Sequence, residues 1–142
     1  MVWRKNRDPL FRGDAADGLT VPEPDAGLSV VDHVLFIGGA GRETQYHSTT
    51  EVEDAARHFA ASDGKVYKTS APQAEAAGVV HISQTELKSL LRGKGHGKAK
   101  GSTALLVMQA RRYVEQWAEH LLDFAELSST DVAQVVKDIY SP

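Results

Sequence analysis

The segment that decides the fold reads Tyr46-His47-Ser48-Thr49-Thr50 and continues as Glu51-Val52-Glu53-Asp54-Ala55-Ala56-Arg57-His58-Phe59-Ala60-Ala61. In its second part, apolar side chains recur at spacings of three and four, which is the pattern of one helix face: Val52, Ala55, Ala56, Phe59 and Ala60. Hydroxyl groups followed by an acid are typical of a helix N-terminus. We therefore predict a strand at 46–50 that leads into a helix at 51–61. The hydroxyl of Ser48 either caps this helix or orients a catalytic acid.

The neighbouring segments carry further strand and turn signals. Residues 65–69 alternate polar and apolar side chains, as a half-buried strand does. Residues 28–37 are rich in Val, Leu, Ile and Phe, which predicts a buried strand, with a short helix as the alternative. The glycine-rich residues 38–41 predict a hairpin turn, because they continue into neither a P-loop nor a dinucleotide-binding fingerprint.

The second half of the chain alternates in the same way. We predict a strand at 79–82, a helix at 84–91 capped by Ser83, and a terminal helix at 132–140 for which an edge strand is the alternative. Between them, Ser102 and Thr103 precede a helix whose apolar stripe is expected to face the core: Leu106, Ala110, Tyr113, Trp117 and Leu121.

Composition indicates an ordinary globular domain. The chain has 142 residues, a hydrophobic fraction of 42%, a net charge of −3 and no cysteine. It therefore suits one domain over 1–142, without disulfides or a Cys-ligated zinc. It has no global basic excess, no apolar run near the roughly 20 residues of a membrane helix, and no apolar secretory signal at its start. We expect a soluble chain that meets no membrane.

Two segments are expected to be mobile loops. Residues 15–27 hold Gly18, Pro22, Pro24 and two aspartates with few large apolar side chains. Residues 92–101 alternate glycine with positive charge, so they offer little apolar surface to offset the entropy of ordering. This basic loop is either a solvated linker or a contact for phosphate or an acidic partner.

Arg12 stands between apolar and acidic residues in Leu10-Phe11-Arg12-Gly13-Asp14, on an apparent first strand. A guanidinium held there would aim into a cleft, and its planar fork suits phosphate or a neighbouring carboxylate. A surface arginine is the plainer alternative. Arg12 together with the hydroxyl-rich residues 46–50 is what a site for a dinucleotide's phosphate and ribose would present.

Taken together, these residues resemble the mono-ADP-ribosyltransferase fold of the pertussis- and cholera-toxin kind, which carries an Arg on the first strand, Ser-Thr-Ser on a middle strand and a late Glu. Arg12-Gly13-Asp14 looks like the family's Arg-x-Asp, and residues 46–50 look like its Ser-Thr-Ser with Thr50 in place of the last Ser. The order of helix and strand that follows is also similar. The resemblance implies an α+β domain with a split mixed or antiparallel sheet core flanked by helices.

The resemblance also implies the site residues. Arg12, His33, Thr49 and Tyr46 would bind NAD, and Ser48 would orient the catalytic glutamate. His33 lies in the sequence where pertussis-like members have a histidine, which would touch the nicotinamide ribose. Tyr46, Phe59 and Tyr67 are the candidates for stacking on the nicotinamide.

Two residues compete for the glutamate. Glu86 in Gln84-Thr85-Glu86 matches the family's tripeptide, but the leucines after it are spaced as in a helix. Glu119 lacks the tripeptide yet precedes an apolar run, so we favour it. If the helix that begins near Ser102 ran through Leu122, Glu119 would lie on its solvated face and the assignment would fail.

The implied activity is NAD-dependent ADP-ribosyl transfer to an unknown protein or nucleic-acid acceptor, or hydrolysis of NAD. Such a domain would be a bacterial toxin or effector, exported by a dedicated system to act in a target cell and countered by an immunity protein. An alternative is a metal-independent ribonuclease built on His47, His33 and the basic loop. Another is an interaction module without catalysis. The six histidines show no HExxH spacing, so a metal site is disfavoured.

Overall fold

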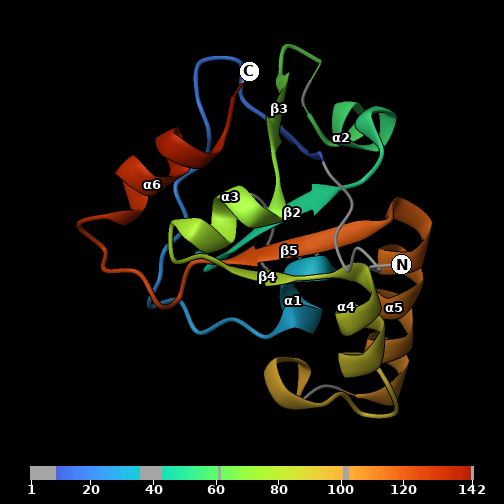
Figure 1. Ribbon diagram of the computed structural model, residues 1–142. Coiled ribbons are helices and arrows are strands. Elements are labelled where there is room, and N and C mark those ends of the chain that lie inside the picture. The colour runs from blue at the N-terminus through green and yellow to red at the C-terminus, as the bar shows by residue number, and fades with distance from the viewer. Residues whose placement is uncertain (1–8, 36–42, 61, 101–102, 142) are drawn as a thin grey trace, which may run out of the picture.

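A five-stranded sheet with helices on both faces makes up the fold (Figure 1). The computed structural model describes residues 9–35, 43–60, 62–100 and 103–141. Every strand pair is antiparallel, and the strand order is β3-β1-β2-β5-β4. The expected α+β class is confirmed, with the sheet antiparallel rather than mixed.

The described residues form five strands and six α-helices. The strands are β1 (Leu10–Asp14), β2 (Tyr46–Thr50), β3 (Lys65–Thr69), β4 (Val80–Ile82) and β5 (Glu119–Asp123). The helices are α1 (Val30–Val34), α2 (Glu53–Phe59), α3 (Ala71–Ala76), α4 (Gln84–Leu90), α5 (Ala104–Trp117) and α6 (Val132–Ile139), with a 3₁₀ turn η1 (Gly97–Ala99). Ser83 forms a capping box with Glu86 at the start of α4, as its position predicts. None of the helices in the described part of the chain is long and apolar enough to cross a membrane.

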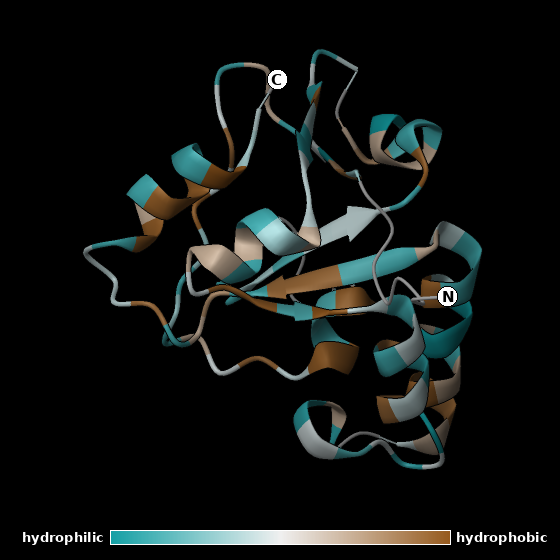
Figure 2. Ribbon diagram, viewed as in Figure 1, coloured by the Kyte–Doolittle hydropathy of each residue, from teal (hydrophilic) through white to brown (hydrophobic). Residues whose placement is uncertain are grey.

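The two faces of the sheet carry separate apolar cores. Side chains of α1, α4 and α5 pack with Tyr46, Ile82 and Leu121 on one face. Side chains of α3 and α6 pack with Tyr67 and Leu122 on the other. Figure 2 shows the apolar sides of α1 and α6 turned toward the sheet. Because neighbouring residues of a strand point to opposite faces, β5 contributes Leu121 to one core and Leu122 to the other.

The sheet splits between β1 and β2. Only Phe11 and Thr50 form a register pair between these strands in the described residues, whereas β1 and β3 form five pairs along their whole length. After Phe11, β1 therefore leaves β2. The main chain of β2 beyond this point has lost its strand neighbour and needs another hydrogen-bond donor.

Gly13 allows α2 to pack closely on β1. A Cβ atom at Gly13 would lie 2.0 Å from the carbonyl oxygen of Ala56 and 2.6 Å from the amide nitrogen of Ala60. Only glycine fits a backbone contact this close. The glycine between Arg12 and Asp14 is therefore set by packing.

The predicted strand at 28–37 is wrong over its described part, because the short helix α1 forms there. Ser29 caps this helix by accepting a hydrogen bond from the Val31 amide. Val30, Val31 and Val34 are buried against the helical layer that includes α5. The apolar run thus reflects burial on a helix, which a run of this length does not distinguish from a strand. The glycine-rich turn expected at 38–41 lies outside the described residues.

The loop at 92–101 was expected to be unable to pack, and its described part differs from that expectation. Ala99 is fully buried in the core beside α1, α4 and α5. Lys98 forms an ion pair with the buried carboxylate of Asp123. Gly95 adopts φ +85° and its absent side chain leaves room for the carbonyl of Ala99. Glycine in this segment therefore allows a tight turn in addition to making the segment flexible.

The loop at 15–27 was also expected to be mobile, yet it is tied to the sheet. The Thr20 amide donates to Asp14, the Thr20 carbonyl oxygen lies 2.7 Å from a ring nitrogen of His47, and the Glu23 amide donates to Thr44. These polar contacts hold a segment that has little apolar surface of its own.

Helix α5 differs from its predicted stripe and ends before Glu119. Its buried residues are Val107, Ala110 and Val114, whereas Tyr113 is 46% exposed. The helix stops at Trp117 because Ala118 adopts the left-handed conformation, with φ 46° and ψ 49°. Glu119 therefore opens a strand instead of extending a helix.

Candidate functional site

Ser48 and Glu119 meet on the face of the sheet that α1 and α5 cover. In the register of β2 and β5, Thr50 pairs with Glu119 and Ser48 with Leu121, so these side chains share one face. The Ser48 hydroxyl lies close enough to the Glu119 carboxyl group to lower its pKa. The pairing of two strands that are far apart in sequence thus joins two of the predicted site residues.

Glu119 is a buried acid with a raised pKa. Its exposed fraction is 7%. Burial raises the pKa of Glu119 to about 7 from an ordinary value of 4.5, although the nearby Ser48 hydroxyl acts in the opposite direction. A carboxyl group that titrates near neutral pH is typical of catalytic acids and bases.

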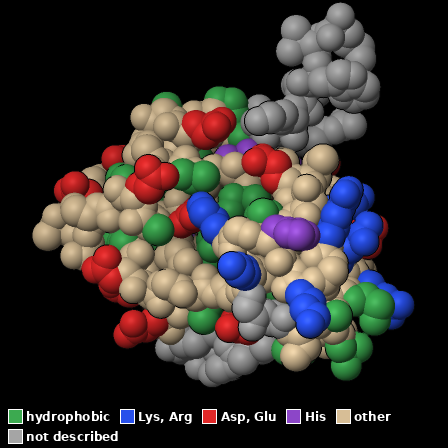
Figure 3. Space-filling view, turned by 90° about the horizontal axis from the view of Figure 1, so that it is seen from below, with side chains coloured by type: hydrophobic (Ala, Val, Ile, Leu, Met, Phe, Trp, Pro, Cys, Tyr) green, Lys and Arg blue, Asp and Glu red, His purple; other side chains and the backbone are tan. Residues whose placement is uncertain are grey.

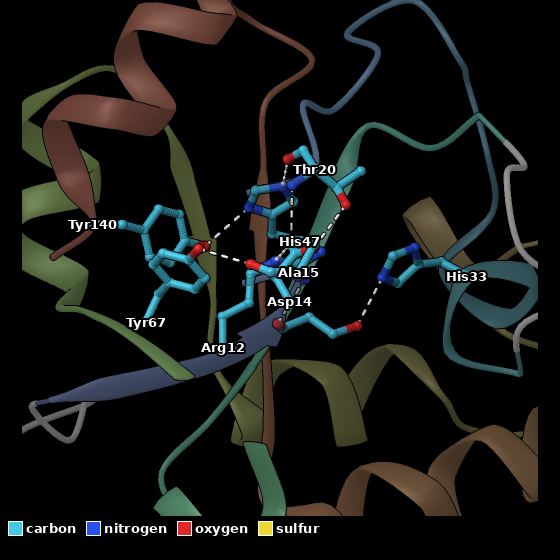
Figure 4. A network of polar contacts seen from close by, with 9 residues as sticks. Arg12, Asp14, Ala15, Thr20, His33, His47, Tyr67 and Tyr140 are labelled. Carbon is cyan, nitrogen blue, oxygen red and sulfur yellow. Dashed lines mark hydrogen bonds and ion pairs between the residues drawn. The ribbon is translucent and has the colours of Figure 1, made fainter. Parts of the chain in front are cut away.

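Arg12 occupies the split in the sheet. Its Nη1 donates to the main-chain oxygen of Ser48 at 3.1 Å, and its Nε donates to Asp14 at 2.9 Å (Figure 4). The guanidinium thus replaces the strand neighbour that Ser48 lost where β1 leaves β2. A guanidinium carries five N–H groups, and these contacts use two of them.

Asp14 fixes this arginine from the end of the same strand. Besides Nε of Arg12, its carboxylate accepts from the Ala15 amide and from the amide and hydroxyl of Thr20. Burial raises the pKa of Asp14, but the charge of Arg12 and these hydrogen bonds outweigh it, so the pKa lies below its usual 3.8. Asp14 is therefore ionised at neutral pH and holds the guanidinium in one orientation.

His33 reaches the same serine from α1. Its Nε2 lies 2.8 Å from Ser48 Oγ (Figure 4). Its Nδ1 lies 2.8 Å from Thr44 Oγ1. The ring is buried and makes an edge contact with Tyr46. Ser48 is thus the centre of the site, with Glu119 and His33 at its hydroxyl and Arg12 at its main chain.

Three predicted residues have structural roles instead. Glu86 serves its helix, because its carboxylate accepts hydrogen bonds from the amide and hydroxyl of Ser83. Thr49 is buried and its hydroxyl donates to the His120 carbonyl, on the opposite face of β2 from Ser48. Tyr46 is 2% exposed, so its ring packs in the core and is not presented to a ligand. The two other predicted stacking aromatics also differ in exposure, since Tyr67 is buried and Phe59 is 52% exposed.

His47 is not placed for acid–base chemistry. Its exposed fraction is 1%, and its two ring nitrogens lie 3.0 Å from the Tyr140 hydroxyl and 2.7 Å from the Thr20 carbonyl. Burial and the nearby charge of Arg12 hold the pKa of His47 well below 6.5. A neutral, enclosed imidazole does not fit the ribonuclease alternative.

Sequence reasoning missed a buried polar chain on the opposite face. His81 Nε2 lies 2.9 Å from His120 Nδ1, and His120 Nε2 lies 2.6 Å from a carboxylate oxygen of Glu51. Its members come from β4, β5 and the end of β2, so only strand pairing joins them. Within the part of the chain that is described, no group of three or more His, Asp or Glu side chains is arranged to hold a metal ion.

A groove lies between the end of α1 and one side of α5. Its volume is about 480 Å³, and its lining residues are Leu35, Leu106, Gln109, Arg112, Tyr113 and Gln116. One wall therefore continues from the helix that carries His33, and the other ends just before Glu119.

No protein-family model, curated protein or solved structure matches this chain.

Proposed function

We propose that this chain binds NAD and breaks the bond between its nicotinamide and ribose, passing the ADP-ribosyl group to water or to a macromolecular acceptor. One observation carries the proposal. Arg12, Ser48 and Glu119 come from three strands and converge at Ser48, whose main-chain oxygen accepts from Arg12 and whose hydroxyl lies near the Glu119 carboxyl group. This is the combination of guanidinium, hydroxyl and carboxylate that the resemblance in sequence implies.

In the proposed reaction, the bond between ribose C1′ and the nicotinamide nitrogen breaks, and its electron pair leaves with nicotinamide. Positive charge develops on the ribose, where a fixed carboxylate stabilises it best. An oxygen or nitrogen of the acceptor then bonds to C1′ and releases one proton. No covalent bond to the protein is required.

Each side chain has a distinct role in this scheme. Glu119 contacts a ribose hydroxyl and supplies the negative charge. Ser48 holds that carboxylate in place, and His33 in turn holds the Ser48 hydroxyl. Arg12, fixed by Asp14, binds the pyrophosphate with the N–H groups that it does not use internally.

The test is release of nicotinamide from NAD by the purified chain. Glu119→Gln removes the negative charge while keeping the size of the side chain, so the rate should fall on the order of 100-fold or more. Ser48→Ala should lower the rate less, because the carboxylate stays but loses its orienting bond. Glu126→Gln, an exposed acid on the same chain, is the matched control and should keep the parent rate.

Two outcomes would contradict the proposal. No nicotinamide release by the parent chain, with or without cell extract as acceptor, would exclude NAD cleavage. Release that survives Glu119→Gln but disappears in Glu86→Gln would move the chemistry away from the site described above. In cells, a toxin of this kind should stop growth on expression, and Glu119→Gln should restore it.

A further inference from the structure

We infer that the acceptor is a single-stranded nucleic acid, which lies along the groove between α1 and α5. This inference rests on the proposed function and names its substrate class. It is carried by two independent features of the described residues: an asymmetry of charge and an exposed aromatic beside an arginine in the groove.

The charge asymmetry is concentrated in one segment. Residues 84–117 hold seven Lys and Arg and two Glu, a net +5 in a chain whose total is −3, so the remainder carries −8. Figure 3 shows Lys and Arg side chains gathered toward the side of α4 and α5, with Asp and Glu toward the other side. An overall acidic chain thus presents one basic side, which attracts a polyanion.

Most of these cations form no ion pair with another described residue. The ion pairs in this segment are Lys88 with Glu115, at 3.9 Å, and Lys98 with Asp123. Within the described residues no ion pair engages the other basic side chains, which are all exposed: Arg92, Lys94, Lys100, Arg111 and Arg112. These side chains therefore face the solvent, where a negatively charged ligand can contact them.

The groove supplies contacts that suit bases as well as phosphates. Tyr113 is 46% exposed and lines the groove together with Arg112, Gln109 and Gln116. An exposed tyrosine ring offers a surface on which a base stacks, and a neighbouring arginine offers a phosphate contact. Glutamine amides both donate and accept, so they match the edges of unpaired bases. A duplex hides these faces, which favours a single strand.

The position of the groove connects it with the proposed chemistry. Gln116 lies three residues before Glu119, and Leu35 follows the helix that carries His33. At the other end, the basic loop docks on the same core through Ala99. A strand in the groove would therefore extend from the basic loop toward Glu119, where one of its nucleophilic groups would meet the ribose.

The experiment is fluorescence anisotropy of the full chain with labelled 15-nucleotide oligodeoxythymidylate, oligouridylate and a DNA duplex, each at 50 and 200 mM salt. We expect the single strands to bind better than the duplex, with affinity that falls as salt rises. The comparison of deoxythymidylate with uridylate identifies DNA or RNA as the preferred acceptor.

Variants assign the binding to the groove. Tyr113→Ala should weaken binding about 10-fold, and Tyr113→Phe, which keeps the ring, should restore it. Arg112→Gln should reduce the slope of log affinity against log salt by about 0.7, the value for one phosphate contact to a single strand. Lys137→Gln on α6 makes the same change of charge on the far face and should leave both quantities unchanged.

The results separate this inference from the proposed function, because nicotinamide release into water needs no acceptor. Release of nicotinamide without oligonucleotide binding, or with label transferred only to proteins, would overturn the acceptor and leave the proposed function standing. Oligonucleotide binding that is unchanged by Tyr113→Ala and Arg112→Gln would refute the groove as the binding site. Displacement of the oligonucleotide by ADP-ribose would assign the groove to NAD and overturn the inference as well.

Discussion

Replacing Glu119 by glutamine should stabilise the folded chain at alkaline pH. Burial raises the pKa of Glu119 to about 7 from 4.5. The unfolded chain therefore loses this proton at a lower pH than the folded chain does. Between pH 4.5 and 7 the folded chain binds more protons, so its stability falls as pH rises, and above pH 7 the full destabilisation is present.

The magnitude follows from the size of the pKa difference. At about 1.36 kcal/mol for each pKa unit, ionised Glu119 lowers the stability of the parent chain by about 3 kcal/mol at pH 8. Glutamine resembles the protonated acid and does not titrate, so Glu119→Gln should be more stable than the parent by that amount. For a domain of this size the gain corresponds to a rise in melting temperature on the order of 10 °C.

The assay is urea unfolding of both chains at pH 5 and pH 8. Comparing the two chains at each pH cancels the titration of all other groups. We expect the variant to exceed the parent by about 3 kcal/mol at pH 8 and by less than about 1 kcal/mol at pH 5. The exposed control Glu126→Gln should show no such dependence. An equal difference at both pH values would refute the raised pKa of Glu119. Together with the expected loss of activity, the result would mark Glu119 as a residue kept for function at the expense of stability.

Two backbone predictions follow from the same structure. Gly13→Ala should lower the free energy of unfolding by about 3 kcal/mol, because its Cβ would collide with the main chain of α2; an unchanged urea midpoint would contradict the close contact. Ala118→Gly should raise the free energy of unfolding by up to about 1 kcal/mol, and with it the melting temperature. The reason is that Ala118 adopts a left-handed conformation that glycine tolerates better. A lower melting temperature for Ala118→Gly would contradict a left-handed end to α5.

Local patterns predicted most of the secondary structure. The alternation at 65–69, the cap at Ser83 and the apolar spacing at 132–140 each depend on neighbours a few residues away, and each element forms as expected. The strand predicted at 28–37 was wrong because a buried apolar run is compatible with strand and helix alike. The apolar stripe predicted for α5 was wrong because a neighbouring face of the helix is the one that is buried. The sequence does not state on which side of the helix the core lies.

The candidate site was predicted less completely. Arg12 and Ser48 could be proposed because they lie on recognisable strands, and Glu119 could be proposed only as one of two acids. The register of β5 against β2 brings Glu119 to Ser48, whereas the capping box keeps Glu86 on its helix. Tyr46 and Thr49 are buried by the same register, which no local pattern reveals.

The sequence by itself determined strands β1 to β4, the helix caps at Ser83 and Thr103, and the basic segment, because these depend on propensities and charges of neighbouring residues. Only the tertiary structure decided which side chains meet. The split between β1 and β2 opens the place that Arg12 fills, and the end of α5 at Ala118 turns Glu119 into the first residue of a strand. Both arise from contacts between residues far apart in the chain, and such contacts form only when the whole sheet is assembled.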